Sequence, residues 1–337
     1  MKKLLPPIVL IFLAPAIAEL LSGSAPPVEF FNPFVFLLLT TLYGSGALLV
    51  RELKHRWHKG WASLFILGAA YGILEDGLMT KSYFDPAWVD IGILGSHGRW
   101  AGVNWVWGLD LTLFHAVVSI AIPILLVELM FPQRRGELWV GKWGLTGLSA
   151  LLAADVAFGY FFLNSYSPPL IPYILAVAAV VALVLLAWRL PHPIFSPKKV
   201  HVRHPLWFWL MGFTGAIAFF LVFWVLPNTN LPPWVTMFIG VGLVAPVVWT
   251  VMRMSGNGSA WSGVHQLALV AGPLSMFILL APIQEFDVSR TDNTVGMTLV
   301  GVAALLFLIW MWWRVRASQA RLVRHKPAQG TDDGSMP

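Results

Sequence analysis

The stretch AYGILEDGLMTKSYFDP, residues 70–86, places two adjacent carboxylates, Glu75 and Asp76, inside an apolar run. The run has small residues at helical spacing before the two acids. A charge at the centre of a membrane helix costs about 2.5–3.5 kcal/mol on insertion scales, so such residues face a cavity or one another. The rest of the chain shows whether this run belongs to a membrane span.

The composition is that of a multi-pass membrane protein. The chain has 337 residues, of which 58% are hydrophobic and 11% charged, whereas a soluble domain has about 25% charged residues. Apolar stretches of about twenty residues recur along the whole chain, and the 18 tryptophans suit many membrane–water boundaries. These features predict an all-α, polytopic transmembrane helical bundle. We expect about ten transmembrane helices, at residues 5–22, 32–50, 61–80, 104–131, 143–164, 169–188, 206–226, 233–252, 263–283 and 294–313.

The basic residues predict the orientation. With a cytoplasmic N-terminus, every Lys and Arg except Lys81, Arg99 and Arg290 falls on the cytoplasmic side, as the positive-inside rule requires. We therefore expect a cell-membrane protein with both termini cytoplasmic. The net charge of +6 is then a topology signal. The expected partner is the lipid bilayer, and a nucleic-acid partner has no support.

The two ends of the chain carry signals of their own. Residues 1–18 have a basic start, an apolar core and Ala16-Ile17-Ala18, which resembles a signal-peptidase site, while two prolines favour retention as a first helix. Both interpretations stay open. We expect residues 1–316 to form a single transmembrane domain. Residues 317–337, which end in KPAQGTDDGSMP, are predicted to be a disordered cytoplasmic tail.

Ionisable residues inside the spans concentrate in the first half of the chain. They are Glu19, Glu75, Asp76, Asp110, His115 and Asp155. At 1.5 Å per residue, Glu75, Asp76 and Asp110 lie roughly 7 Å below the outer surface, with His115 deeper. We therefore expect a buried polar site within residues 1–165 and a scaffold in residues 166–316.

The site residues suggest two kinds of chemistry. Glu75 is the candidate general base, Asp76 would hold its geometry, and His115 would stabilise an oxyanion or shuttle a proton. Glu19, Asp110, Tyr71, Lys81 and Asp155 are candidates for binding or for a proton relay. Tyr71 shares a helix face with Glu75 because the two are four residues apart.

No cofactor or metal is assigned. The chain has no cysteine, which excludes disulfides and thiolate metal sites. One histidine among several carboxylates could hold a divalent ion, but catalytic zinc usually takes more histidine.

Two further patterns concern packing and access. Gly68 and Gly72 form a GxxxG motif, which most often serves helix packing. The loop 81–103 is long for this chain, and its Trp88 and Trp100 are expected to cap an outward-opening cavity at the interface. An ordinary interfacial loop explains the same residues equally well.

Three stretches carry a resemblance. LYGSGALLVREL (42–53), AYGILEDGL (70–78) and FHAVVSIAIPILLVELMFP (114–132) are similar to a group of uncharacterised bacterial and archaeal multi-pass membrane proteins. That resemblance implies no known activity. The chain also faintly resembles membrane glutamic endopeptidases of the CPBP and PrsW type, in which Glu75-Asp76 would match a Glu-Glu pair and His115 a later histidine. The second acid here is Asp, and His265 lies at the opposite surface from the pair.

Three functions therefore stay open. They are an intramembrane hydrolase, a proton- or cation-coupled transporter or channel, and a non-catalytic assembly or lipid-binding protein. A lateral opening towards lipid near Glu75 would favour hydrolysis, and a path to the cytoplasm would favour transport. The substrate and the oligomeric state are not specified by the sequence.

Overall fold

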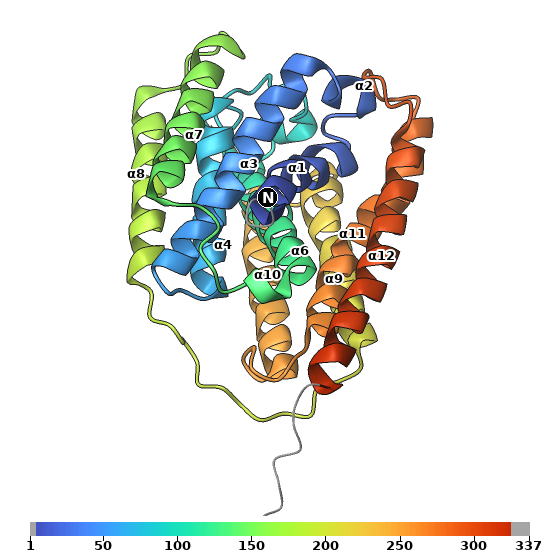
Figure 1. Ribbon diagram of the computed structural model, residues 1–337. Helices are drawn as coiled ribbons and strands as arrows, with labels where there is room; N and C mark the ends of the chain where they lie inside the picture. The colour runs from blue at the N-terminus through green and yellow to red at the C-terminus, as the bar shows by residue number, and fades with distance from the viewer. Residues whose placement is uncertain (1–4, 325–337) are drawn as a thin grey trace, which may run out of the picture.

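The computed structural model describes residues 5–324, with side chains to residue 320, and this part of the chain is almost entirely helical (Figure 1). Within it, nine helices are long and apolar enough to cross a membrane. They are α3 (Pro33–Arg56), α4 with η2 (Trp61–Met79), α5 with η4 and α6 (Trp105–Met130), α7 (Lys142–Phe162), α8 (Leu170–Arg189), α9 with η6 and η7 (Pro205–Asn228), α10 (Pro233–Ser255), α11 (Gly263–Phe286) and α12 (Met297–Arg324). The predicted all-α bundle is confirmed.

A shorter apolar helix precedes these nine. It consists of α1 (Leu5–Pro15) and η1 (Ala16–Leu21) and packs on α3. A Cβ on Gly44 of α3 would lie 3.0 Å from the Cα of Ile11, so a side chain there would force the two backbones apart. This helix occupies the position of the first of the ten expected spans.

The remaining elements are short connections. They are α2 (Pro27–Phe30), η3 (Gly92–Gly95), β1 (Arg99–Trp100), β2 (Val103–Asn104) and η5 (Pro132–Arg134). The strands β1 and β2 pair antiparallel in the loop that the sequence analysis expected to cap the site, with Arg99 opposite Asn104. The loop is therefore an ordered hairpin.

The most enclosed helices lie between residues 33 and 130. The α5–η4–α6 helix is the most enclosed, with 83% of its apolar window buried, followed by α4–η2 at 61% and α3 at 56%. By contrast, only 6% of the α8 window is buried. In Figure 1, α7 and α8 flank this core on one side, and α9, α11 and α12 pack together on the other. The outer helices present apolar side chains to their surroundings, as lipid contact requires.

Three of the core helices are locally widened into π-helix. These segments are η1, η2 (Ile73–Met79) and η4 (His115–Ala121). A proline lacks the N–H and its ring clashes with the carbonyl four residues earlier. Pro15 is the last residue of α1, directly before η1. Pro123 lies four residues after Ser119 of η4, so the widened turn relieves the clash of its ring with the Ser119 carbonyl. Such π-segments occur frequently at functional sites.

The GxxxG motif sets the contact between α4 and η4. A Cβ on Gly68 would lie 2.8 Å from the Cα of Ala116, and one on Gly72 would lie 3.0 Å from the Cβ of His115. The two glycines therefore let the backbone of α4 approach the helix that carries His115.

Replacing Gly68 with alanine is expected to lower the free energy of unfolding by about 1–3 kcal/mol, since the backbone of η4 must move to admit the methyl group. Gly147 of α7 is the control because nothing lies within 4 Å of its Cβ position. There the same change should stabilise by about 0.5–1 kcal/mol through helix propensity. Detergent unfolding curves measure both, and a stabilising Gly68→Ala would contradict the packing argument.

The expected boundary of the tail is wrong. Helix α12 continues to Arg324, whereas the sequence analysis began the disordered tail at residue 317. The segment RVRASQARLVR, residues 314–324, is rich in Arg, Ala, Gln and Leu, which are good helix formers, and so extends the helix beyond its apolar part. Residues 325–337 lie outside the described part of the chain.

Candidate functional site

Five side chains, four of them buried and Glu19 half-buried, form one group, the acidic–histidine cluster. They are Glu19, Tyr43, Glu75, Asp76 and His115. Each acid and the histidine comes from a π-helical segment, η1, η2 or η4, and Tyr43 comes from α3. The structure thus brings together four of the residues predicted from the sequence, and adds Tyr43.

His115 joins the two adjacent acids. Its Nε2 lies 2.7 Å from Oδ2 of Asp76, and its Nδ1 lies 3.5 Å from Oε2 of Glu75. The same Nδ1 is 2.9 Å from Oγ of Ser119, one turn further along the helix. The imidazole therefore faces both carboxylates. The acids of η2 and the histidine of η4 thus face one another.

Tyr43 connects the other two acids. Its hydroxyl contacts Oε1 of Glu19 and Oε1 of Glu75. A tyrosine hydroxyl has one proton to donate and can also accept. If Tyr43 donates to one carboxylate, the other contact needs a proton on the second carboxyl, which then donates to the tyrosine oxygen. The geometry therefore calls for a proton on Glu19 or Glu75.

Two more predicted residues lie at the edge of the cluster. Asp110 is buried and interacts electrostatically with Asp76 and His115. The Tyr71 hydroxyl is buried beside the Glu75 carboxylate at a geometry short of a full hydrogen bond. The Tyr71 ring packs 6.1 Å from the His115 ring. Its main role in this arrangement is to enclose the imidazole.

The other two predicted residues bind elsewhere. The Lys81 ammonium donates to the backbone carbonyls of Tyr160 and Asn164, at 2.8 Å and 2.9 Å. Asp155 accepts from the Thr41 hydroxyl at 3.1 Å. Lys81 ties the capping loop to the end of α7, and Asp155 ties α7 to α3. Neither is a member of the cluster.

The loop 80–104 closes the site. Ser82 Oγ donates to Asp76 Oδ1 at 3.2 Å and receives the Trp107 indole N–H at 3.1 Å. Buried Asn104 donates to the carbonyls of Ser82 and Asp85 and accepts from Arg99 at 2.6 Å.

The expected outward-opening cavity is therefore not present around the acids. Glu75, Asp76 and His115 are only 5%, 7% and 4% exposed. The residues above them make specific hydrogen bonds and so form a lid in place of a vestibule. Trp100 is 73% exposed on this loop.

A second ionic group lies at the opposite end of the same helices. We call it the inner ion cluster, and it consists of Arg51, Glu52, Lys54, Glu128 and Arg135. Glu52 pairs with Arg51 at 2.7 Å and accepts from the Trp139 backbone N–H at 2.9 Å. Glu128 lies 2.9 Å from Arg135 and 3.5 Å from Lys54. The Arg51 guanidinium also stacks over Trp139 at 3.7 Å.

Three of these residues, Glu52, Glu128 and Tyr43, are not among those predicted from the sequence. Glu52 and Glu128 lie close to the ends of their spans. A charge there costs little free energy to insert, so its position does not indicate a functional site. A signal was nevertheless present, since LYGSGALLVREL contains both Tyr43 and Glu52, and FHAVVSIAIPILLVELMFP contains both His115 and Glu128. Each stretch therefore runs from one cluster to the other.

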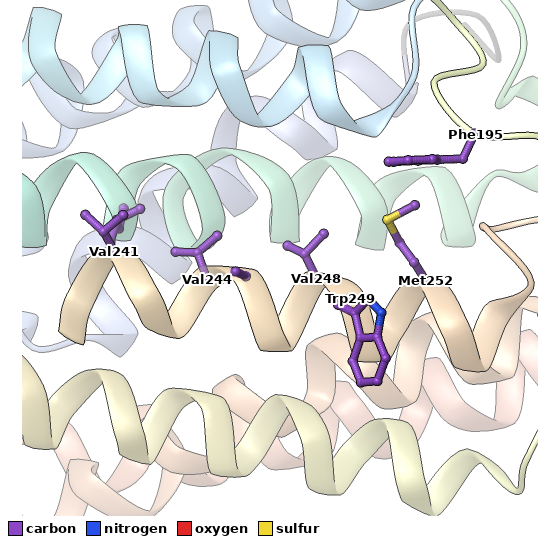
Figure 2. A pocket seen from close by; sticks show the side chains of 8 residues that line it. Phe195, Val241, Val244, Val248, Trp249 and Met252 are labelled. Atoms are coloured by element: carbon purple, nitrogen blue, oxygen red, sulfur yellow. The ribbon is translucent and has the colours of Figure 1, made fainter. Parts of the chain in front are cut away.

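Two surface hollows lie outside the acidic–histidine cluster. One, of about 570 Å³, is an apolar groove beside α10 whose lining includes Leu113 of α5. Figure 2 shows Val241, Val244, Val248 and Met252 along it, with Phe195 facing Met252. The other hollow, of about 620 Å³, has a basic lining at the turn between α3 and α4. In the described residues, no group of three or more His, Asp or Glu side chains has a geometry that could hold a metal ion.

The fold and the site together define a multi-pass helical membrane protein with a closed acidic–histidine cluster in its core. A family model described as an uncharacterised membrane protein family matches residues 8–255, which is well over half of the chain. The chain belongs to this family. No curated protein and no solved structure matches it. The resemblance to the glutamic endopeptidases receives no support from these comparisons.

Proposed function

We propose that the protein is a proton-coupled membrane transporter whose acidic–histidine cluster binds and releases the coupling proton. The observation that carries this proposal is the position of Tyr43 between Glu19 and Glu75. One hydroxyl proton cannot satisfy two carboxylates, so the group is complete only with an additional, shared proton. Intramembrane acids and histidines that contact one another are typical of proton relays.

The helices of the cluster provide a second line of support. Its acids and histidine lie on three widened helical segments that meet in the core. Transporter sites are commonly built where membrane helices are locally irregular. A π-segment can revert to α-helix by shifting one residue, which would move Glu75 or His115 relative to its neighbours. Protonation would then be linked to a change of helix geometry.

The two ionic groups also occupy one helix pair at different depths. Tyr43 and Arg51 lie eight residues apart on α3, or about 12 Å along its axis. His115 and Glu128 share the α5–η4–α6 helix. This helix pair therefore connects the acidic–histidine cluster with the inner ion cluster.

A membrane-embedded hydrolase is the second candidate, with Glu75 as general base. The apolar groove of Figure 2 favours it, since the groove lies between two spans and reaches Leu113, two residues before His115. A lipid-soluble substrate could approach by that route. The cluster itself is enclosed, however, and its residues do not line the groove. We therefore place transport first.

Infrared difference spectroscopy on reconstituted protein tests the proton site without knowledge of a substrate. Stepping the pH should change the C=O band of a protonated carboxyl, and Glu75→Gln should remove that change because an amide carries no titratable proton. Asp155→Asn is the matched control, since it removes a buried carboxyl that binds Thr41 outside the cluster. It should leave the Glu75-dependent signal intact.

The same variants separate the two candidate functions. Proteoliposomes containing a pH-sensitive dye should show substrate-dependent proton movement for wild type and Asp155→Asn, and none for Glu75→Gln. Cleavage of a membrane-peptide panel that is abolished by Glu75→Gln would favour the hydrolase instead. A carboxyl band that titrates identically in wild type and Glu75→Gln would overturn the proton-site proposal.

A further inference from the structure

We propose that the basic hollow at the α3–α4 turn binds a phosphate-bearing anion. The side chains and backbone that line its volume of about 620 Å³ come from three segments far apart in the sequence. They are Lys54, His55, Arg56, His58, Lys59, Gly136, Leu138 and His192. Three of the residues are lysine or arginine and three are histidines, and the lining includes no carboxylate.

The carboxylates beneath the hollow do not neutralise it. Glu128 is paired with Arg135 at 2.9 Å, so Lys54 at 3.5 Å is a second cation on the same acid. Glu128 also has His55 Nε2 at 3.1 Å. This acid is therefore already matched from within the bundle, which leaves positive charge on the hollow side.

Glu52, the second acid beneath the hollow, is also already paired with cations. Glu52 is paired with Arg51 at 2.7 Å, and Arg56 approaches it at 3.7 Å. At the rim, Glu137 is engaged with Arg134 at 2.9 Å. A cavity with excess cationic groups over low-dielectric walls concentrates anions.

The hollow also has spare hydrogen-bond donors. Lys59 Nζ donates to the Leu190 carbonyl at 2.7 Å, which occupies one of its three donors. His192 packs against Gly60. A Cβ atom on Gly60 would lie 2.6 Å from Nδ1 of His192. Tetrahedral phosphate oxygens accept several charge-assisted hydrogen bonds at once and suit such a set of donors.

The phosphate could belong to an anionic phospholipid or to a free ion. Basic pockets at the cytoplasmic ends of membrane helices commonly bind anionic headgroups, and the distribution of Lys and Arg predicts that this end is cytoplasmic. The linker after α8 supplies His192 to the hollow and Phe195 to the apolar groove. Headgroup contacts and acyl-chain contacts thus arise from one segment, and a phospholipid is tested alongside the free ion.

Native mass spectrometry of the detergent-solubilised protein measures lipid retention, with phosphatidylglycerol as the anionic probe and phosphatidylcholine as the zwitterionic reference. Isothermal titration with inorganic phosphate tests the free ion. The test variant is Lys59→Gln combined with His192→Gln, because both residues line the hollow, Lys59 half-buried and His192 exposed. Lys142→Gln is the control because Lys142 is exposed at the same end of the bundle, two residues from Val140, whose carbonyl accepts from Arg56.

Wild type and Lys142→Gln should retain phosphatidylglycerol in preference to phosphatidylcholine, or bind phosphate, and the double variant should do so on the order of tenfold more weakly. Retention of the lipid without phosphate binding would identify a headgroup site. Phosphate binding lost only in the double variant would identify a free-anion site. Equal binding by the double variant and wild type, or no binding of either probe by wild type, would overturn the proposal.

Discussion

Glu128→Gln is expected to lower the free energy of unfolding by about 3–5 kcal/mol, because it leaves buried cations without their counter-charge. Glu128 is fully buried and contacts Arg135 at 2.9 Å, His55 at 3.1 Å and Lys54 at 3.5 Å. An amide fills nearly the same volume, so the change isolates the loss of charge from the loss of packing. The effect should appear in detergent-induced unfolding followed by tryptophan fluorescence.

Glu137→Gln is the matched control. Its carboxylate also pairs with an arginine, Arg134 at 2.9 Å, but its side chain is 54% exposed. Exposed pairs contribute about 0.2–1 kcal/mol, so this variant should lie close to wild type. If both variants unfold at the same detergent concentration, the inner ion cluster does not stabilise the bundle and Glu128 is retained for another reason.

The position of Glu128 explains why so much depends on it. Arg135, which it binds, also donates to Gln266 of α11 at 2.9 Å, and the Arg135 carbonyl accepts from Arg51 of α3 at 2.9 Å. One carboxylate therefore anchors a residue that joins α6 to α3 and α11. Loss of the anchor should loosen this end of the bundle as a unit.

Much of this architecture follows from the apolar periodicity of the sequence. Span positions depend on the length of apolar runs, and a bilayer imposes that length uniformly. Glu75, Asp76 and His115 were found because a charge deep in an apolar run is costly and therefore conspicuous. Asp155 met the same criterion, yet it binds Thr41 outside the cluster. Lys81, at the outer end of its run, binds the backbone carbonyls of Tyr160 and Asn164. Depth alone does not specify the direction in which a side chain points.

The features that were not predicted from the sequence change its apolar pattern very little. Tyr43 is an aromatic in an apolar helix, and such a residue usually signals an interface or packing. The π-segments leave the apolar pattern almost unchanged, because one inserted residue shifts the helical face only after the insertion. The closed lid over Asp76 depends on hydrogen bonds between Ser82, Asn104 and Arg99, whose pairing only the folded loop defines.

Tyr43→Phe is expected to have the second large effect. It removes the hydroxyl that contacts Glu19 and Glu75 and leaves two buried carboxyls facing a hydrocarbon ring. Leaving buried polar groups unsatisfied costs about 1–3 kcal/mol. In the infrared experiment, Glu19 and Glu75 should then titrate as separate groups, because the hydroxyl that joins them is gone.

Tyr71→Phe provides the comparison within the same cluster. The Tyr71 hydroxyl is equally buried but makes no full hydrogen bond, so its removal should change the free energy of unfolding by less than about 1 kcal/mol. Its ring, which packs against His115 and Tyr43, is kept. The pair of variants thus separates the loss of a bridging hydroxyl from the loss of a hydroxyl as such.

The combination of stability and proton uptake distinguishes a structural cluster from a functional one. If Tyr43 only holds the helices together, Tyr43→Phe should unfold earlier while the pH dependence of the carboxyl signal stays that of wild type. If Tyr43 carries the shared proton between Glu19 and Glu75, the titration should split even at temperatures where the variant is fully folded. Proton-linked transport should then fall with it, whereas Tyr71→Phe retains both. An unsplit titration in folded Tyr43→Phe would mean that the proton is shared through His115 and Asp76 instead, which His115→Gln would test by the same measurement.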